Sequence, residues 1–192
     1  MNFFVIVFLA IFMTPVAAMD MTIRGDTLVM SGAVVDSDHV RFMELSKTPQ
    51  FAKVRIVVLQ NSPGGRIWPV TEIAREIRKR RLSTLVDASR SFCYSACTGL
   101  FAAGVSRHYV NAAGIDPRIP QQRGLGFHEG SSVATGQRQY SGAGTAQMID
   151  IYYEMGVSGA AKIVSNATFR GIYRIPGQRA LELGIATSLS PP

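Results

Sequence analysis

Three short segments of this chain carry groups that together could hydrolyse an acyl bond. Residues 59–65 (LQNSPGG) end in two glycines, which can adopt backbone conformations closed to other residues and expose their N–H groups. Ser95, in the segment 91–98 (SFCYSACT), can face a cleft from the first turn of a helix. His128 lies between glycines in the segment 124–130 (GLGFHEG), a setting that suits a general base. A histidine can activate a serine hydroxyl, and backbone N–H groups can stabilise the oxyanion that forms next.

Each segment also has a simpler interpretation when it is taken alone. Two glycines after a strand form a turn, Ser95 is a good helix cap, and His128 could lie on the surface. His39 and His108 have no comparable surroundings, and we assign them no catalytic role. The chemistry therefore depends on whether the fold brings the three segments together.

Alternating strands and helices must position these segments. Runs rich in apolar and β-branched residues predict strands at 27–35, 53–59, 82–86, 107–110 and 125–128. Apolar residues at helical spacing predict helices at 37–47, 69–81, 93–104, 145–155, 158–169 and 176–183. The run 53–59 is so apolar that we expect burial on both faces of its sheet. The alternation predicts an α/β fold with a largely parallel sheet.

The order of the motifs resembles the proteolytic subunit of the Clp protease and its relatives in the ClpP/crotonase superfamily. The sequence NSPGG at 61–65 precedes Ser95 by about thirty residues, and His128 follows about thirty residues later. The sequence ALELGIA at 180–186 resembles the C-terminal ending of that family. The resemblance is to divergent, exported members, and it covers nearly the whole chain after its first residues. It implies a spiral of ββα units.

Carried over by position, the resemblance implies that Ser95 is the nucleophile and His128 the general base. It also implies that the N–H groups of Gly65 and Ala96 form the oxyanion hole. The activity that follows is that of a serine hydrolase, most simply a peptidase. It would act on a peptide or protein substrate through an acyl-enzyme and without a cofactor. Members of this family commonly self-associate, so a homo-oligomer is expected.

The family's third catalytic group, an aspartate shortly before the last helix, has no counterpart here. Alignment back from residues 180–182 places Ile172 at that position, and residues 155–181 contain neither Asp nor Glu. Asp150 could serve if its helix bends towards the site, and Asn166 could orient the imidazole. The remaining interpretations are a Ser–His dyad, a third group from elsewhere, or loss of catalysis.

Two other functions compete with the exported serine hydrolase. The first is a catalytically inactive ClpP-like scaffold that binds peptides or partner proteins. The second is a relative of signal-peptide peptidase A, which uses serine and lysine; Lys162 is the only lysine after Ser95. The setting of His128, directly after Gly-Phe, argues against the second interpretation.

Cys93 and Cys97 bracket Ser95 and are the only cysteines of the chain. On one helix they would lie roughly 6 Å apart along the axis, close enough for a disulfide but with nearly parallel side chains. A bond forms more easily if Cys93 precedes the helix, and export would favour oxidation. A disulfide and a pair of buried thiols both stay open, and no Cys/His cluster predicts a metal site.

The composition is that of one globular domain. The chain has 192 residues, 47% of them hydrophobic, and a mean hydropathy of +0.15, which excludes a disordered protein. The net charge is +7, and the basic run 78–81 ends a predicted helix, where cations suit the helix dipole and stay in solvent. No nucleic-acid motif or interleaved aromatic residue accompanies this run, so we predict no nucleic-acid partner.

The beginning of the chain predicts export. Residues 3–18 carry no charge, their apolar part has the length of a signal-peptide core, and VAA at 16–18 offers small residues for cleavage after Ala18. We therefore expect a signal peptide at 1–18 and one ClpP-like domain at 19–192, periplasmic or secreted. The lack of Lys or Arg before the apolar part leaves an uncleaved membrane anchor as the competing interpretation. An exported chain would have no ATP for an ATP-driven unfoldase, so no such partner is expected.

Overall fold

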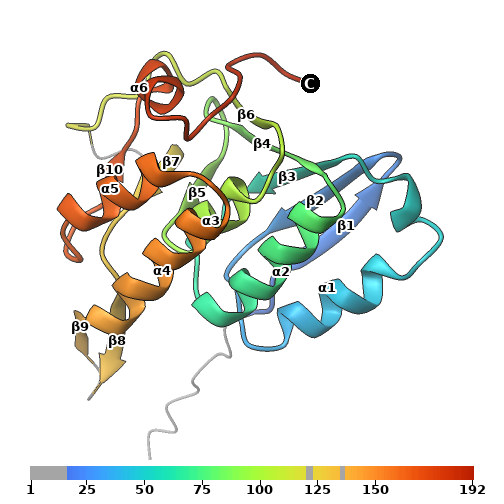
Figure 1. The fold of residues 1–192 in the computed structure, drawn as a ribbon, viewed down its shortest axis with the longest axis horizontal. Coiled ribbons are helices and arrows are strands. Elements are labelled where there is room, and N and C mark those ends of the chain that lie inside the picture. Colours follow the sequence, from blue (N-terminus) through green and yellow to red (C-terminus); the bar gives the residue numbers. More distant parts are fainter. Residues whose placement is uncertain (1–16, 120–122, 135–136) are drawn as a thin grey trace, which may run out of the picture.

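A computed structural model describes residues 17–119, 123–134 and 137–192 of the chain (Figure 1). The expected signal peptide lies almost wholly outside the described residues. Within them, no helix is both long enough and apolar enough to cross a lipid bilayer.

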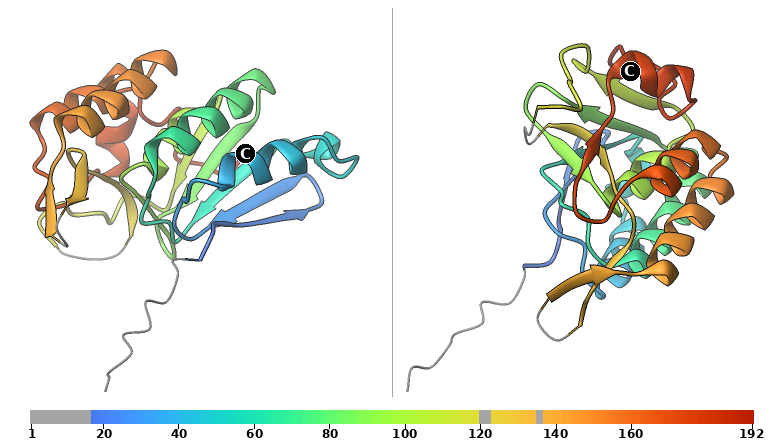
Figure 2. Two further views of the ribbon diagram at one scale, coloured as in Figure 1. Left: turned by 90° about the horizontal axis from the view of Figure 1, so that it is seen from below. Right: turned by 90° about the vertical axis from the view of Figure 1, so that its left-hand side faces the viewer.

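The larger sheet has five strands in the order β1-β2-β3-β4-β6. The strands are β1 (Asp20–Arg24), β2 (Thr27–Ser31), β3 (Ile56–Gln60), β4 (Ser83–Asp87) and β6 (Arg107–Val110). β1 and β2 form an antiparallel hairpin, and the other three pairs are parallel. In β3, Val57 is fully buried and Val58 only partly buried, so the expected burial on both faces is incomplete. Helices lie over one face of this sheet (Figure 2).

A smaller sheet carries the strands that directly precede Ser95 and His128. It contains β10 (Tyr173–Arg174), β7 (Gly124–Phe127) and β5 (Phe92–Tyr94), in that order. β5 runs parallel to β7, and a single parallel bridge between Ser62 and Cys93 joins the loop after β3 to β5. A separate hairpin of β8 (Ser131–Ala134) and β9 (Gln137–Tyr140) follows β7. The carboxyl ends of β3, β5 and β7 therefore meet at one place.

The helices are α1 (Asp38–Ser46), α2 (Ile67–Lys79), α3 (Cys97–Ala102), α4 (Gly142–Glu154), α5 (Ser158–Asn166) and α6 (Gly177–Glu182), with a 3-10 turn at Phe51–Lys53. α1 and α2 lie side by side over the larger sheet, while α4 and α5 lie near the smaller one (Figures 1 and 2). α2 shows why these segments are helical. Its buried residues include Val70, Ile73 and Ile77, which share one side of the helix and pack into the core.

The structure differs from the sequence prediction mainly around the serine. The apolar run 93–104 predicts a single helix, but Cys93 belongs to β5 and α3 begins at Cys97. Pairing with β7 decides this, because hydrogen bonds to a distant strand override a local helical pattern. Prediction from periodicity also misses β1, β8, β9 and β10, which are short or lack an apolar face; every residue of β9 is exposed.

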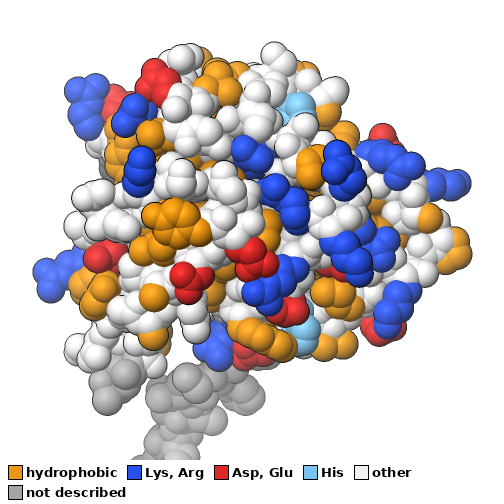
Figure 3. Space-filling model, in the orientation of Figure 1, with side chains coloured by type: hydrophobic (Ala, Val, Ile, Leu, Met, Phe, Trp, Pro, Cys, Tyr) orange, Lys and Arg blue, Asp and Glu red, His pale blue; other side chains and the backbone are white. Residues whose placement is uncertain are grey.

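The basic run at the end of α2 lies only partly in solvent. Arg78 donates hydrogen bonds to the carbonyls of Ala102 (2.8 Å) and Met155 (2.9 Å), at the carboxyl ends of α3 and α4. Burial lowers the pKa of Arg78. The prediction of a solvated run is therefore wrong for this residue, which caps two helices. Arg80, at the end of the same helix, pairs with Glu76 (2.6 Å). On the face of the molecule seen in Figure 3, acidic side chains lie among the basic ones.

Candidate active site

Ser95 occupies the turn between β5 and α3. Its φ is +56°, in the left-handed region that costs a non-glycine residue roughly 1–2 kcal/mol. Two backbone hydrogen bonds hold the turn: the N–H of Ser95 donates to the carbonyl of Gly126 (2.9 Å), and the N–H of Tyr94 donates to the carbonyl of Ser62 (2.9 Å). The neighbouring strands thus impose the turn, and they present the serine at the end of β5 rather than inside a helix.

A disulfide closes the same turn. Cys93 in β5 and Cys97 in α3 are joined, with their Cα atoms 5.3 Å apart, and both residues are fully buried. Cys93 precedes the helix, which is the arrangement that eases the bond. Because both cysteines of the chain are paired, neither is available as a thiol nucleophile.

The glycine-rich loop after β3 packs directly against the Ser95 turn. Gly64 has a φ of +88° and Gly65 a φ of +143°, values that other residues rarely adopt. A Cβ atom on Gly64 would lie 2.6 Å from the carbonyl oxygen of Tyr94 and 2.8 Å from the nitrogen of Ala96. A Cβ atom on Gly65 would overlap the carbonyl oxygen of Val34. Both positions therefore require glycine for conformation and for space.

Two backbone N–H groups are free at this junction. Among the described residues, neither the N–H of Gly65 nor that of Ala96 donates a hydrogen bond. Val34 fixes the loop by bonding both neighbours of Gly65: its N–H donates to the carbonyl of Gly64 (2.8 Å), and its carbonyl accepts from the N–H of Arg66 (3.0 Å). Two fixed, free N–H groups beside a serine are what an oxyanion hole needs.

Ser95 and His128 line one cavity of about 380 Å³. Gly65, Arg138 and Ile172 also line it, and among the described residues no carboxylate does. The fold therefore brings all three segments of the sequence analysis to one place. In the described part of the chain, however, no hydrogen bond joins Ser95 Oγ to His128. The assigned roles of serine, histidine and oxyanion donors stay predictions.

His128 follows β7 and is 7% exposed. Its Nδ1 donates a short hydrogen bond to the carbonyl of Glu129; since a carbonyl can only accept, Nδ1 carries the proton and Nε2 the lone pair. Nη2 of Arg138 lies 3.2 Å from Nδ1 and 3.3 Å from Nε2. Burial lowers the pKa of His128 and the charge of Arg138 lowers it further, whereas the Glu129 carbonyl raises it. Burial and the charge of Arg138 thus favour the neutral imidazole, which is the form that can accept a proton.

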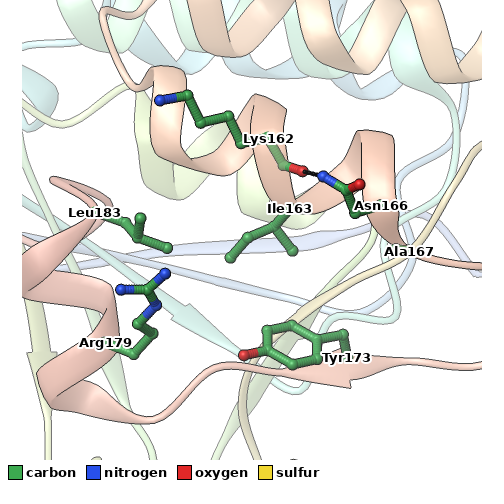
Figure 4. Close-up of a pocket in the computed structure, with 7 residues that line it drawn as sticks. All are labelled: Lys162, Ile163, Asn166, Ala167, Tyr173, Arg179 and Leu183. Atoms are coloured by element: carbon green, nitrogen blue, oxygen red, sulfur yellow. Dashed lines mark hydrogen bonds between the residues drawn. The ribbon is translucent and has the colours of Figure 1, made fainter.

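Neither candidate for the third catalytic group lies at His128. Asp150 is exposed on α4 and lines a different groove beside Trp68. Asn166 donates from Nδ2 to the carbonyl of Lys162 in its own helix (2.7 Å; Figure 4). The polar groups that do contact the imidazole are the Glu129 carbonyl and Arg138, and the sequence analysis identified neither. A backbone carbonyl has no sequence signal because every residue has one. Arg138 contacts the ring only because the β8–β9 hairpin places it there.

The lysine of the Ser–Lys interpretation is also elsewhere. Lys162 lines a pocket of about 290 Å³ between α5 and α6, together with Ile163, Arg179 and Leu183 (Figure 4). Ser95 does not line that pocket. In the described ranges, no group of three or more His, Cys, Asp or Glu side chains could hold a metal ion.

Comparisons with known proteins bear on the fold. No family model matches the chain, and no curated protein matches it. Among solved structures, it is similar to a mutant form of the membrane-bound stomatin-specific protease 1510-N, with a TM-score of 0.55, 11% identity, and coverage of 84% of this chain and 77% of that one. For another mutant form, in complex with a substrate peptide, the TM-score is 0.53, the identity 13%, and the coverage 84% and 73%.

A second kind of enzyme shares the architecture. A putative enoyl-CoA hydratase/isomerase (crotonase) from Legionella pneumophila has a TM-score of 0.52 and 13% identity, with coverage of 90% of this chain and 70% of that one. The chain therefore has the ClpP/crotonase fold, and the predicted fold class is confirmed. Because these identities are so low, the likeness concerns the fold alone, and the chemistry must be argued from the site.

Proposed function

We propose that this chain is a ClpP-like serine hydrolase that cleaves peptide bonds. One observation carries the proposal: Ser95 sits in a left-handed turn, in one cavity with His128, and beside two N–H groups that donate no hydrogen bond within the described residues. These are the nucleophile, the oxyanion donors and the base of acyl transfer. The fold that it shares with a stomatin-specific protease supports peptides as the substrate class.

In the proposed reaction, Nε2 of His128 accepts the hydroxyl proton of Ser95 while Oγ attacks the substrate carbonyl. The carbonyl oxygen becomes negative, and the N–H groups of Gly65 and Ala96 donate to it. When the tetrahedral intermediate collapses, Nε2 returns the proton to the leaving amine and an acyl-enzyme remains. Water, deprotonated by the same nitrogen, then attacks the acyl-enzyme; the product acid leaves, and Nε2 returns the proton to Oγ of Ser95.

The Glu129 carbonyl takes over part of the task of the missing aspartate. It keeps the proton on Nδ1 and so sets the tautomer of His128 that catalysis needs. It carries no full negative charge, and the nearby charge of Arg138 opposes protonation of the ring. Disabling the acid of a complete Ser-His-Asp triad costs about 10⁴ in kcat. We therefore expect turnover that depends on Ser95 but is slow.

A catalytically inactive scaffold is the alternative function. Two features favour it: Ile172, at the aligned position of the family's aspartate, is apolar and lines the cavity. In addition, no hydrogen bond joins Ser95 to His128 among the described residues. In that case the cavity would bind a peptide without cleaving it.

We also propose that residues 1–18 are a signal peptide and that 19–192 act as a periplasmic or secreted domain. The disulfide supports an oxidising compartment. An uncleaved anchor is the competing arrangement. N-terminal sequencing of the protein from the cell envelope distinguishes them: export with cleavage gives a chain that begins at Met19, whereas an anchor keeps Met1. Self-association is part of the proposal; nucleic acid, a cofactor and an ATP-driven unfoldase are not.

A fluorophosphonate probe tests the hydrolase directly, because it reacts with an activated serine. We expect labelling of the wild type, none of Ser95→Ala, and normal labelling of Ser89→Ala, a control at an exposed turn outside the cavity. Absence of labelling in a folded wild type would favour the scaffold. Equal labelling of wild type and Ser95→Ala would place the reactive serine elsewhere.

A further inference from the structure

The carboxylate of Asp38 is fully buried at the start of α1 and holds the beginning of the described domain. Its Oδ2 accepts hydrogen bonds from the N–H of Met19 (3.3 Å) and of Val35 (2.7 Å). Its Oδ1 accepts from Nη1 of Arg41 (2.8 Å), which also donates to the carbonyl of Met19 (2.8 Å). Met19 is itself fully buried. The backbone is therefore clamped at Met19 through both its N–H and its carbonyl.

Met19 is also the residue at which the proposed cleavage would start the mature chain. Hydrolysis of the bond between Ala18 and Met19 adds water, leaving a carboxylate on Ala18 and an amino group on Met19 that is mostly protonated at pH 7. Ala17 and Ala18 are exposed, so this bond is accessible. The nitrogen that donates one amide N–H to Asp38 would then have three donors and a positive charge.

We propose that Asp38 is the acceptor site for the α-ammonium group of a chain that begins at Met19. The biological occurrence of that chain rests on the proposed export, whereas the ion pair depends only on where the chain begins. Hydrogen bonds between charged partners are roughly twice as strong as neutral ones. Within the described residues the buried carboxylate has one cationic partner, Arg41, whose side chain is 45% exposed. A precursor or an anchored chain lacks the second cation, because its Met19 nitrogen is a neutral amide.

The same carboxylate is linked through the backbone of Val34 and Val35 to the glycine-rich loop at 61–65, which we call the oxyanion loop. Val35, whose N–H donates to Asp38, directly follows Val34, which bonds the backbone on both sides of Gly65. Asp38 is thus a positioning residue that acts through Val34 and Val35 and does not touch substrate. A stronger hold on Met19 and Asp38 orders the N–H of Gly65 before substrate arrives.

Three forms of the chain test the ion pair: one beginning at Met19 with a free amino group, the same chain with that group acetylated, and one beginning at Ala17. We expect the free Met19 chain to melt about 3–8 °C above both others. Asp38→Asn should abolish the difference between the free and acetylated forms. Asp36→Asn is the matched control, since this nearby acid is exposed and pairs with Arg66 (2.8 Å); it should leave the difference intact.

Equal melting temperatures of the free and acetylated chains would overturn the ion pair. If Asp38→Asn fails to fold, the comparison of the free and acetylated chains still tests the ion pair, because acetylation keeps every side chain. Faster fluorophosphonate labelling of the free chain supports the link to the oxyanion loop, and equal labelling with unequal melting refutes that link. If no form is labelled, the proposed hydrolase fails, whereas the melting temperatures still decide the ion pair.

Discussion

Removal of the disulfide beside Ser95 should weaken both the fold and the nucleophile. The bond joins β5 to α3 across a sequence separation of four, so it closes a very small loop around the serine. For a loop of about five residues, the chain-entropy relation gives about 2 kcal/mol of stabilisation at 25 °C. In a chain of this length that corresponds to about 4–8 °C in Tm. We expect Cys93→Ala/Cys97→Ala to lose at least this much, because two buried sulfur atoms also leave the core.

The effect on reactivity follows from the backbone of Ser95. Its left-handed conformation costs roughly 1–2 kcal/mol, which is comparable to the constraint that the disulfide supplies. Without the bond the turn can relax, and the N–H of Ala96 then moves away from the oxyanion. Loss of one oxyanion donor costs about 10²–10³ in rate, so partial misplacement should slow fluorophosphonate labelling about tenfold or more.

Two measurements check this reasoning: thermal melting, and labelling rates well below the lowered Tm so that unfolding does not contribute. Wild type treated with reductant separates the cross-link from the packing of the sulfurs, since it keeps both atoms. If the double variant melts lower but is labelled at the wild-type rate, the hydrogen bonds to Gly126 and Ser62 suffice to hold the turn. An unchanged Tm together with an unchanged rate would refute the whole argument.

Three further predictions concern the same cavity. Gly65→Ala should abolish labelling and destabilise the fold, because its Cβ would overlap the carbonyl of Val34. The control Gly25→Ala has a φ of +64° and nothing within 4 Å of its Cβ, so it should cost only about 1–2 kcal/mol and leave labelling intact. Similar losses in both variants would contradict the steric account. The labelling rate should rise with pH through the pKa of His128, which burial lowers from its ordinary value, because only the neutral ring accepts the proton of Ser95. Arg138→Gln removes a positive charge beside the ring and should move this rise to higher pH, so an unshifted profile would argue against the contact. Ile172→Asp should raise peptide turnover about tenfold by stabilising the imidazolium, whereas Ile172→Asn should not, and equal rates in the two variants would show that position 172 does not influence the ring.

Much of the architecture could be predicted from local patterns. The helix at 67–79 follows from apolar residues at helical spacing, and the strands β2, β3 and β4 follow from short runs of β-branched residues. These patterns are visible because each element buries one continuous face in the core. Strand β9 buries no such face, since all four of its residues are exposed, so nothing in its sequence marks it as a strand.

The amino-acid sequence by itself determined the types of residue available for chemistry and their order along alternating strands and helices. Glycines in 61–65, Ser95 and His128 each follow a strand, and parallel strands carry their carboxyl ends to one edge. Only the tertiary structure decided which groups meet there. The strand around Cys93, the carbonyl that holds the His128 tautomer and the apolar Ile172 in the cavity all depend on contacts between segments far apart in the chain. Local sequence patterns cannot predict such contacts, because a contact contributes its stabilising energy only when the distant segment is in place.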